Sequence, residues 1–151
     1  MAEDKSFFEK VAMTRQEFLD YLSQPLIARI ASVKAGRPYL TPVWYLYDGE
    51  YFMVSTGVNT QQAKNIQNNP NVSLVIDSSA GMFAHKCIIV RGKGELTRAG
   101  HPEITKKIYL RYLGEAGLNN PFAVQLLQED QYIIRIKPRK TMTWDYAKLI
   151  K

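Results

Sequence analysis

The stretch YFMVSTGVNTQQAKNIQNNP, residues 51–70, joins a strand pattern to a helix pattern, and the rest of the fold is arranged around it. Its first six residues alternate between two faces, which is typical of a half-buried β-strand. One face carries Phe52, Val54 and Thr56, and the other carries Tyr51, Met53 and Ser55. Gly57 interrupts the alternation, and Asn59 or Thr60 then provides an N-cap for a short helix over residues 61–67. The stretch therefore predicts a strand that runs directly into a capped helix.

This strand-to-helix turn contains no carboxylate. No Asp or Glu occurs from Tyr51 to Ile76, and the first helical turn holds Gln, Gln and Ala, followed by Lys64. A helix N-terminus carries unpaired N–H groups and partial positive charge, which favour an anion. With the hydroxyls of Ser55 and Thr56, these groups suit an external phosphate. The alternative is an amide-capped surface helix with one solvated lysine.

The size and composition of the chain indicate a globular protein with one domain, residues 1–151. The chain is long enough to bury a core, and 46% of its residues are hydrophobic while 23% are charged. No apolar run reaches membrane-spanning length, and the first ten residues lack a signal-peptide pattern. We therefore expect a soluble, cytoplasmic protein with no membrane partner. The single cysteine, Cys87, excludes an intrachain disulfide framework.

The net charge of +6 favours anionic partners, such as a phosphorylated cofactor, a nucleic acid or an acidic surface. The basic residues are spread along the chain without a consecutive block, so nucleic acid is not the partner we expect. A nucleic-acid-binding barrel remains a rival class. His85 and His101 are the only histidines, and neither lies in a metal-binding spacing, so no metal site is predicted.

Hydrophobic periodicity predicts six strands separated by short helices. The strands are expected at residues 26–33, 39–47, 51–56, 71–77, 86–96 and 131–137. The helices are expected at residues 14–22, 61–67, 101–114 and 120–127. An Asp48-Gly49 turn makes the first three strands an antiparallel meander, and Gly92 and Gly94 indicate a bulge or sharp bend in the fifth strand.

This order of elements predicts a mainly β fold with some α (α+β): a six-stranded antiparallel split β-barrel with short covering helices. Two-residue turns cannot make parallel connections, so the sheet is expected to be mostly antiparallel. The helical insertion before the last strand is expected to cover an opening of the barrel.

Two segments, LIARIASVKAGRPYLTPVWYLYDGEYFMVSTG (residues 26–57) and KNIQNNPNVSLVID (residues 64–77), carry a family resemblance. They closely resemble the N-terminal core of the pyridoxamine 5'-phosphate oxidase-like, FMN-binding split-barrel family. The features concerned are the Gly-Arg-Pro turn, Pro-Val-Trp, the Asp-Gly hairpin, the Ser-Thr strand end, and Lys-Asn-Ile followed by Asn-Pro. The likeness is looser from the Gly92–Gly94 strand to Trp144.

The resemblance implies a homodimer with two equivalent cofactor sites at the subunit interface. It assigns cofactor contacts to seven residues. Val43 and Trp44 line the isoalloxazine ring, Ser55 and Thr56 lie near the ribityl chain and phosphate, Gln61 and Lys64 contact the phosphate, and Trp144 is contributed by the partner subunit.

The chain also departs from the enzyme that gives the family its name. That enzyme is longer and ends in an Arg-Leu-x-Pro tail that reaches its substrate, whereas this chain ends in WDYAKLIK. The shorter layout resembles the family's small branch, whose members hold FMN, a deazaflavin (coenzyme F-420), haem or a bilin. We therefore predict an FMN-binding oxidoreductase that transfers hydride or electrons to a small substrate. The alternatives are an F-420-dependent reductase and a non-catalytic flavin or haem binder.

No catalytic side chain is assigned, because a flavin accepts hydride on its own ring while the protein orients it. The residues alone show no signature of a nucleophile, and Cys87 lies on an apolar strand, where a buried, inert thiol is expected. The substrate and the electron donor are not specified by any motif in this chain.

Overall fold

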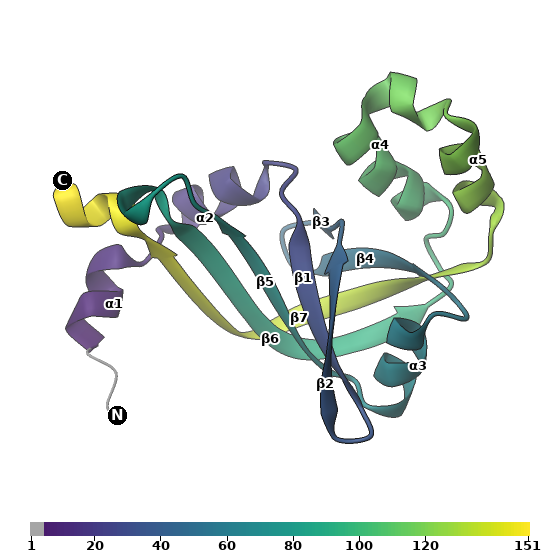
Figure 1. Cartoon of the computed structure of the whole chain (residues 1–151), viewed down its shortest axis with the longest axis horizontal. Coiled ribbons are helices and arrows are strands. Elements are labelled where there is room, and N and C mark those ends of the chain that lie inside the picture. Colours follow the sequence, from purple (N-terminus) through teal and green to yellow (C-terminus); the bar gives the residue numbers. More distant parts are fainter. Residues whose placement is uncertain (1–4) are drawn as a thin grey trace.

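A computed structural model describes residues 5–151, and its centre is a strongly curved sheet (Figure 1). The sheet has seven strands: β1 (Ala28–Lys34), β2 (Arg37–Val43), β3 (Leu46–Tyr47), β4 (Phe52–Gly57), β5 (Asn71–Ser78), β6 (Lys86–Thr97) and β7 (Gln131–Asp145). The helices are α1 (Lys5–Val11), α2 (Arg15–Leu22), α3 (Gln61–Asn68), α4 (Glu103–Leu118) and α5 (Pro121–Gln128), with 3-10 turns η1 (Met82–Ala84) and η2 (Tyr146–Ile150). No helix among these residues is long and apolar enough to cross a membrane.

The strands lie in the order β2-β1-β5-β6-β7-β4-β3, and every neighbouring pair is antiparallel. The mainly antiparallel architecture is therefore confirmed. The predicted count of six strands was wrong. The two antiparallel pairings of the predicted meander are present, β1 with β2 and β3 with β4, but they do not form one continuous meander, because β4 lies next to β7 and not next to β2. The strand expected at residues 39–47 is broken at Trp44 and Tyr45, which places β2 and β3 at opposite edges of the sheet.

The break has a tertiary cause. Tyr45 is fully buried in the core, and its hydroxyl donates a hydrogen bond to the carbonyl of Leu22 at 3.3 Å. Trp44 turns the other way and stacks on Tyr112 of α4. Trp44 and Tyr45 are thus held by partners more than twenty residues away in sequence, so their backbone does not pair with a neighbouring strand and the strand ends before them.

Local signals placed the other elements well. The Asp48-Gly49 hairpin joins β3 to β4, with Tyr47 paired to Phe52. The predicted bulge lies between Arg91 and Gly92, where a side chain on Gly92 would collide with the backbone carbonyl of a β7 residue. The cap of α3 is Thr60, whose hydroxyl accepts the Ala63 N–H at 3.1 Å.

Helices α4 and α5 form a separate layer beside one end of the sheet (Figure 1). Four side-chain hydrogen bonds tie α4 to the end of α2 and the chain that follows it. Arg111 donates to the carbonyls of Leu22 (2.5 Å), Ser23 (3.4 Å) and Gln24 (2.7 Å), and Tyr112 donates to that of Leu26 (2.6 Å). The helix bends at Gly114, whose φ of +70° suits glycine. This layer is thus anchored near its middle and turns back through α5.

Candidate functional site

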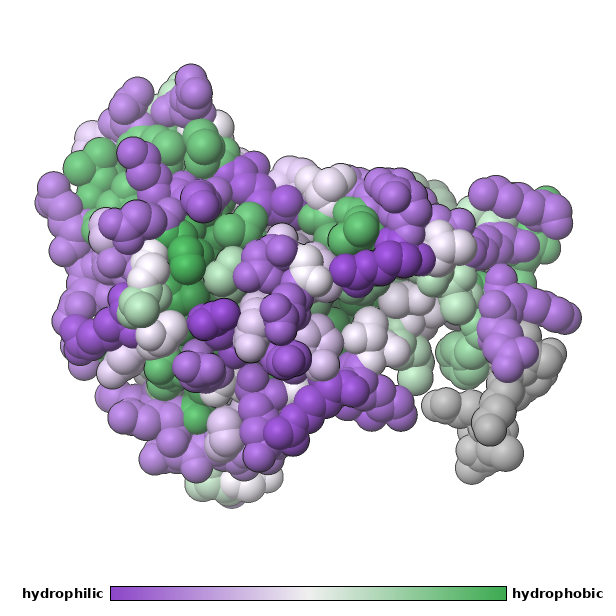
Figure 2. Space-filling view, turned by 180° about the vertical axis from the view of Figure 1, so that it is seen from behind, coloured by the Kyte–Doolittle hydropathy of each residue, from purple (hydrophilic) through white to green (hydrophobic). Residues whose placement is uncertain are grey.

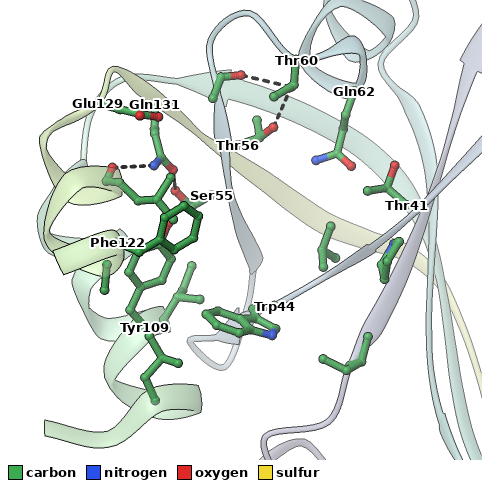
Figure 3. A pocket seen from close by; sticks show the side chains of 18 of the residues that line it. Thr41, Trp44, Ser55, Thr56, Thr60, Gln62, Tyr109, Phe122, Glu129 and Gln131 are labelled. Carbon is green, nitrogen blue, oxygen red and sulfur yellow. Dashed lines mark hydrogen bonds between the residues drawn. The ribbon is translucent and has the colours of Figure 1, made fainter. Parts of the chain in front are cut away.

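A cavity of about 910 Å³ lies between the end of the sheet and the α4–α5 layer (Figure 3). Its walls come from the end of β2 and the Trp44 break, the end of β4, the first turn of α3, and the inner faces of α4 and α5. The volume falls within the range of small-molecule and cofactor sites. The break in the second predicted strand is therefore also the feature that opens one wall of this cavity.

The wall facing α4 is aromatic. Trp44 stacks on Tyr112 with ring centroids 4.9 Å apart and planes 5° apart, and it meets Tyr109 edge-on at 5.8 Å. Burial raises the pKa of Tyr112, so its hydroxyl remains protonated and bridges the Leu26 carbonyl and the Tyr45 N–H. Phe122 of α5 also lines the cavity although its side chain is 66% exposed. This wall offers broad, flat apolar contact of the kind that suits a planar ring.

A polar part of the lining lies next to the α4–α5 layer and is organised by Gln131, the first residue of β7. Gln131 Nε2 donates to the Leu126 carbonyl at 2.7 Å, so its Oε1 must accept the Ser55 hydroxyl proton. Ser55 Oγ lies 2.9 Å from Thr105 Oγ1, and Thr105 Oγ1 lies 2.8 Å from Nδ1 of His101.

The direction of this chain of hydrogen bonds follows from its first member. Because Ser55 has given its only proton to Gln131, Thr105 must donate to Ser55, and His101 Nδ1 must carry a proton that it donates to Thr105. The Ser55 hydroxyl therefore presents only a lone pair to the cavity. One set of bonds therefore holds four residues, which come from β4, β7, α4 and the turn before α4.

A second, shorter chain runs along the turn into α3. Thr60 Oγ1 donates to the Gly57 carbonyl at 3.1 Å and accepts from Thr56 Oγ1 at 2.8 Å, so Thr56 also presents only a lone pair (Figure 3). Next to them lies Gln62, which is 5% exposed. Its Oε1 is buried and has no hydrogen-bond partner among the residues that the structure describes.

Charge is nearly absent from the cavity. Among the residues that the structure describes, the lining includes none of the chain's lysines or arginines, and its only formally charged member is Glu129. The excess positive charge of the chain therefore lies elsewhere on the protein. The part of the cavity that one subunit builds is neutral to acidic.

The structure brings four of the seven predicted site residues together: Val43, Trp44, Ser55 and Thr56 all line the cavity. Gln61 and Lys64 do not line it. Gln61 donates to Asn65 Oδ1 at 2.7 Å, and Lys64 is exposed on the outer side of α3.

Trp144 lies near the far end of β7, where its indole faces His85 and Tyr146. It is thirteen residues beyond Gln131, or about 40 Å of strand at ~3.3 Å per residue. Trp144 therefore cannot contact the cavity of its own subunit, and the contact assigned to it across a dimer remains a prediction.

Several lining residues were not predicted from the sequence, namely Gln62, Tyr109, Phe122 and Gln131. For Gln62 a signal was present, because residues 62, 63 and 66 share one face of a helix whose Ile66 is plainly apolar. The other three come from elements more than forty residues away in sequence, and only the folded topology brings them to β4.

Cys87 is buried, as expected, and burial raises the pKa of its thiol to about 12. It does not line the cavity.

Comparison with known proteins identifies the fold and the family. Residues 14–145 match the sequence profile described as pyridoxamine 5'-phosphate oxidase. General stress protein 26 of Bacillus subtilis (strain 168) is 27% identical over 95 residues, which cover 63% of this chain and 66% of that protein, just under two thirds of its length.

Two solved structures show the same architecture. A conserved hypothetical protein of Mycobacterium tuberculosis has a TM-score of 0.81 at 25% identity, covering 94% of this chain and 91% of that one. A protein described as an F420 reductase has a TM-score of 0.65 at 24% identity, covering 81% and 93%. Because the profile match extends over most of the sequence, this chain belongs to the pyridoxamine 5'-phosphate oxidase family.

Proposed function

We propose that the protein binds the ring of a flavin-type cofactor, FMN or the deazaflavin F-420, in the 910 Å³ cavity and uses it in oxidoreductase chemistry on a small substrate. The observation that carries the proposal is the pairing of an aromatic wall at Trp44 with a polar wall at Ser55 and Thr56. These are residues that the family resemblance assigns to the cofactor. An isoalloxazine ring needs both a flat apolar face and hydrogen-bonding groups at its edge.

A bound flavin or deazaflavin ring supplies hydride transfer, so the chain's task is to hold and orient the ring and to exclude water. Stacking on Tyr112 fixes the position of the Trp44 ring in the cavity wall. The hydrogen bonds from Gln131 through Ser55 to Thr105 fix the polar wall against it. The α4–α5 layer closes the side of the cavity that would otherwise face solvent.

A haem-binding function is the weaker candidate for this cavity. Haem iron needs an axial ligand, most often histidine, cysteine or methionine. None of these is among the described residues that line the cavity. A haem would therefore depend on a ligand from outside the cavity.

We also propose that two copies associate, with each cavity completed by its partner. Edge strand β2 is largely exposed, with Leu40 67% accessible, and large apolar side chains of α4 and α5 are exposed as well. Figure 2 shows hydrophobic surface gathered over the α4–α5 end of the molecule. An open edge and an apolar patch on one molecule are features of an interface.

The test of cofactor binding is to denature the protein as purified and to identify the released small molecule by mass. Release of FMN or F-420 near one equivalent per chain is the expected result. The apoprotein should also bind added FMN or F-420, and Trp44→Leu should weaken that binding while Trp144→Leu in the same assay reports the partner's contribution. If neither compound is released and neither binds in large excess, the proposed function is wrong.

Catalysis is tested separately, by mixing the loaded protein anaerobically with reduced nicotinamide and recording the cofactor's visible absorbance. Loss of the oxidised band supports an oxidoreductase. Stable cofactor binding without reduction by this or other donors would favour a storage or sensor protein.

A further inference from the structure

Arg111 of α4 does not line the cavity, but it contacts two tyrosines that adjoin the Trp44 ring in the cavity wall. We propose that Arg111 is a positioning residue: its guanidinium holds Tyr45 and Tyr112, and through them it sets the place of the Trp44 ring. The effect on cofactor affinity rests on the proposed function. The placement of Trp44 is a property of the protein alone.

The first support is the set of carbonyls that Arg111 binds. Its two terminal nitrogens donate to three successive carbonyls at the end of α2, those of Leu22, Ser23 and Gln24. The last carbonyls of a helix lack partners within the helix and carry partial negative charge, so a cation is favoured there. No carboxylate pairs with Arg111 among the residues that the structure describes, so the end of α2 is the negative group that faces this cation.

The second support is the contact of the guanidinium with two tyrosine rings. Its central carbon lies 5.0 Å from the ring centroid of Tyr45 and 5.7 Å from that of Tyr112. Both distances are within the range of a cation–π interaction, which is stronger where water is excluded. Tyr45 is fully buried, and Nε of Arg111 is buried as well. One flat cation therefore restrains two rings from different parts of the chain.

The third support is the link from these rings to Trp44. Tyr112 stacks on Trp44 with ring centroids 4.9 Å apart, and Tyr45 is the next residue along the chain. The Tyr45 N–H also donates to the Tyr112 hydroxyl at 3.3 Å, which joins the two tyrosines. A change at Arg111 therefore reaches Trp44, which lines the cavity (Figure 3).

Two substitutions at Arg111 separate its charge from its shape. Arg111→Leu removes both the cation and the donors. Arg111→Lys keeps a cation at the end of α2, but an ammonium group is a compact point charge and lacks the planar surface of a guanidinium. Both substitutions should therefore release the tyrosine rings.

Arg15 provides the matched control. Its guanidinium lies 5.3 Å from the ring centroid of Phe18 and 5.9 Å from that of Tyr47, and it donates to the Gly49 carbonyl at 3.2 Å. None of these residues lines the cavity. Arg15→Leu thus removes the same kinds of contact without reaching Trp44.

The first test measures the accessibility of the Trp44 ring in the full-length apoprotein. A Trp144→Phe background leaves Trp44 as the only tryptophan, and acrylamide quenching of its fluorescence reports how exposed the ring is. The quenching constant should rise in Arg111→Leu and Arg111→Lys and keep its wild-type value in Arg15→Leu. An unchanged constant in Arg111→Leu, or a wild-type constant in Arg111→Lys, would overturn the proposal.

The second test is a double-mutant cycle on cofactor affinity, with Trp144 intact. The probe is FMN, or F-420 where that is the compound the protein releases, and dissociation constants come from cofactor fluorescence. Arg111→Leu should bind the probe about three- to tenfold more weakly, the loss expected for a displaced aromatic contact. Arg15→Leu should stay within about twofold of wild type.

The same substitution in a Trp44→Leu background shows whether Arg111 acts through this ring. Arg111→Leu should there weaken binding by less than about twofold, because the ring that transmits its effect is already absent. Equal losses in the two backgrounds would mean that Arg111 loosens the fold in general, and the proposal would be wrong.

Melting temperatures check that each variant is folded, and Arg111→Lys replaces Arg111→Leu in both tests if the leucine variant does not fold. If the wild type binds neither FMN nor F-420, the proposed function fails. The quenching constants of the apoprotein then still decide whether Arg111 positions Trp44.

Discussion

Replacing Gln131 with leucine should destabilise the protein through the hydrogen bonds that this side chain organises. Gln131 is 4% exposed, donates to the Leu126 carbonyl at 2.7 Å and accepts from Ser55. The substitution removes both bonds, which deprives the Leu126 carbonyl of this donor and the Ser55 hydroxyl of this acceptor in a part-buried site. With a net ~1 kcal/mol for each bond and a further cost for the unpaired groups, the free energy of unfolding should fall by about 2–4 kcal/mol.

Urea denaturation measures this effect. For a protein of this size a slope of about 2 kcal/mol per molar is typical, so the midpoint should fall by about 1–2 M. Gln125→Leu is the matched control, because Gln125 is exposed and, among the described residues, its side chain bonds only that of Glu129, at 3.4 Å across one helical turn. Its effect should stay within about 0.5 kcal/mol.

A second measurement tests the direction of the bonds. In the wild type, nitrogen NMR should find the His101 proton on Nδ1, since Thr105 can only accept from it. In Gln131→Leu the Ser55 hydroxyl is released and this constraint is lost, so the other tautomer should gain population. Equal destabilisation by the two glutamine substitutions, or a wild-type His101 with its proton on Nε2 alone, would refute the reasoning.

Three further predictions concern other parts of the fold. Burial raises the pKa of Tyr45 and Tyr112, so the folded state holds their protons more tightly than the unfolded state. The free energy of unfolding, measured by urea denaturation, should therefore be constant near neutral pH and fall above about pH 10. Tyr112→Phe should reduce that fall. Gly92→Ala should lower the free energy of unfolding by about 2 kcal/mol or more because its methyl group meets the β7 backbone, whereas Gly57→Ala, which makes only ordinary contact, should cost less than about 1 kcal/mol in the same urea experiment. Cys87, with its thiol pKa raised to about 12, should react with a maleimide far more slowly in the folded protein than in urea, and equal rates would show that the strand is not closed over it.

The sequence determined the elements whose signals are local. The cap at Thr60, the Asp48-Gly49 hairpin and the bulge at Gly92 each depend on residues within a few positions of one another. The mainly antiparallel architecture followed from the short connections between strands. These features could be predicted because their causes lie inside the segment concerned.

The break at Trp44 and Tyr45 could not be predicted in the same way. The nine residues around it alternate as one continuous strand, and Pro42, which disfavours a central strand, lies inside β2 and does not mark the break. The cause is the pairing of Tyr45 with Leu22 and of Trp44 with Tyr112, which exists only once α2 and α4 are in place. A strong local pattern was overridden by tertiary packing.

The candidate site shows a different kind of error. The positive charge of Lys64 suggested a phosphate contact. The structure instead places Lys64 on the outer face of α3, because buried Ile66 sets the helical phase that turns Gln62 inward. The helical periodicity of residues 62, 63 and 66 therefore indicates from the sequence alone that Gln62 faces inward. Tyr109, Phe122 and Gln131 could not be placed in this way, because their approach to β4 depends on where a long insertion folds back.

The placement of β2 and β3 at opposite margins has a mechanical consequence. Terminal strands in an open sheet normally fray independently, since nothing links one margin to the other. Here two consecutive residues, Trp44 and Tyr45, connect them directly, so the chain acts as a tether that joins the first strand of the order to the last. Loosening of either edge strand would displace Trp44, which lines the cavity, or Tyr45, which is buried in the core, so a ligand in the cavity should slow amide exchange in β2 and β3 together.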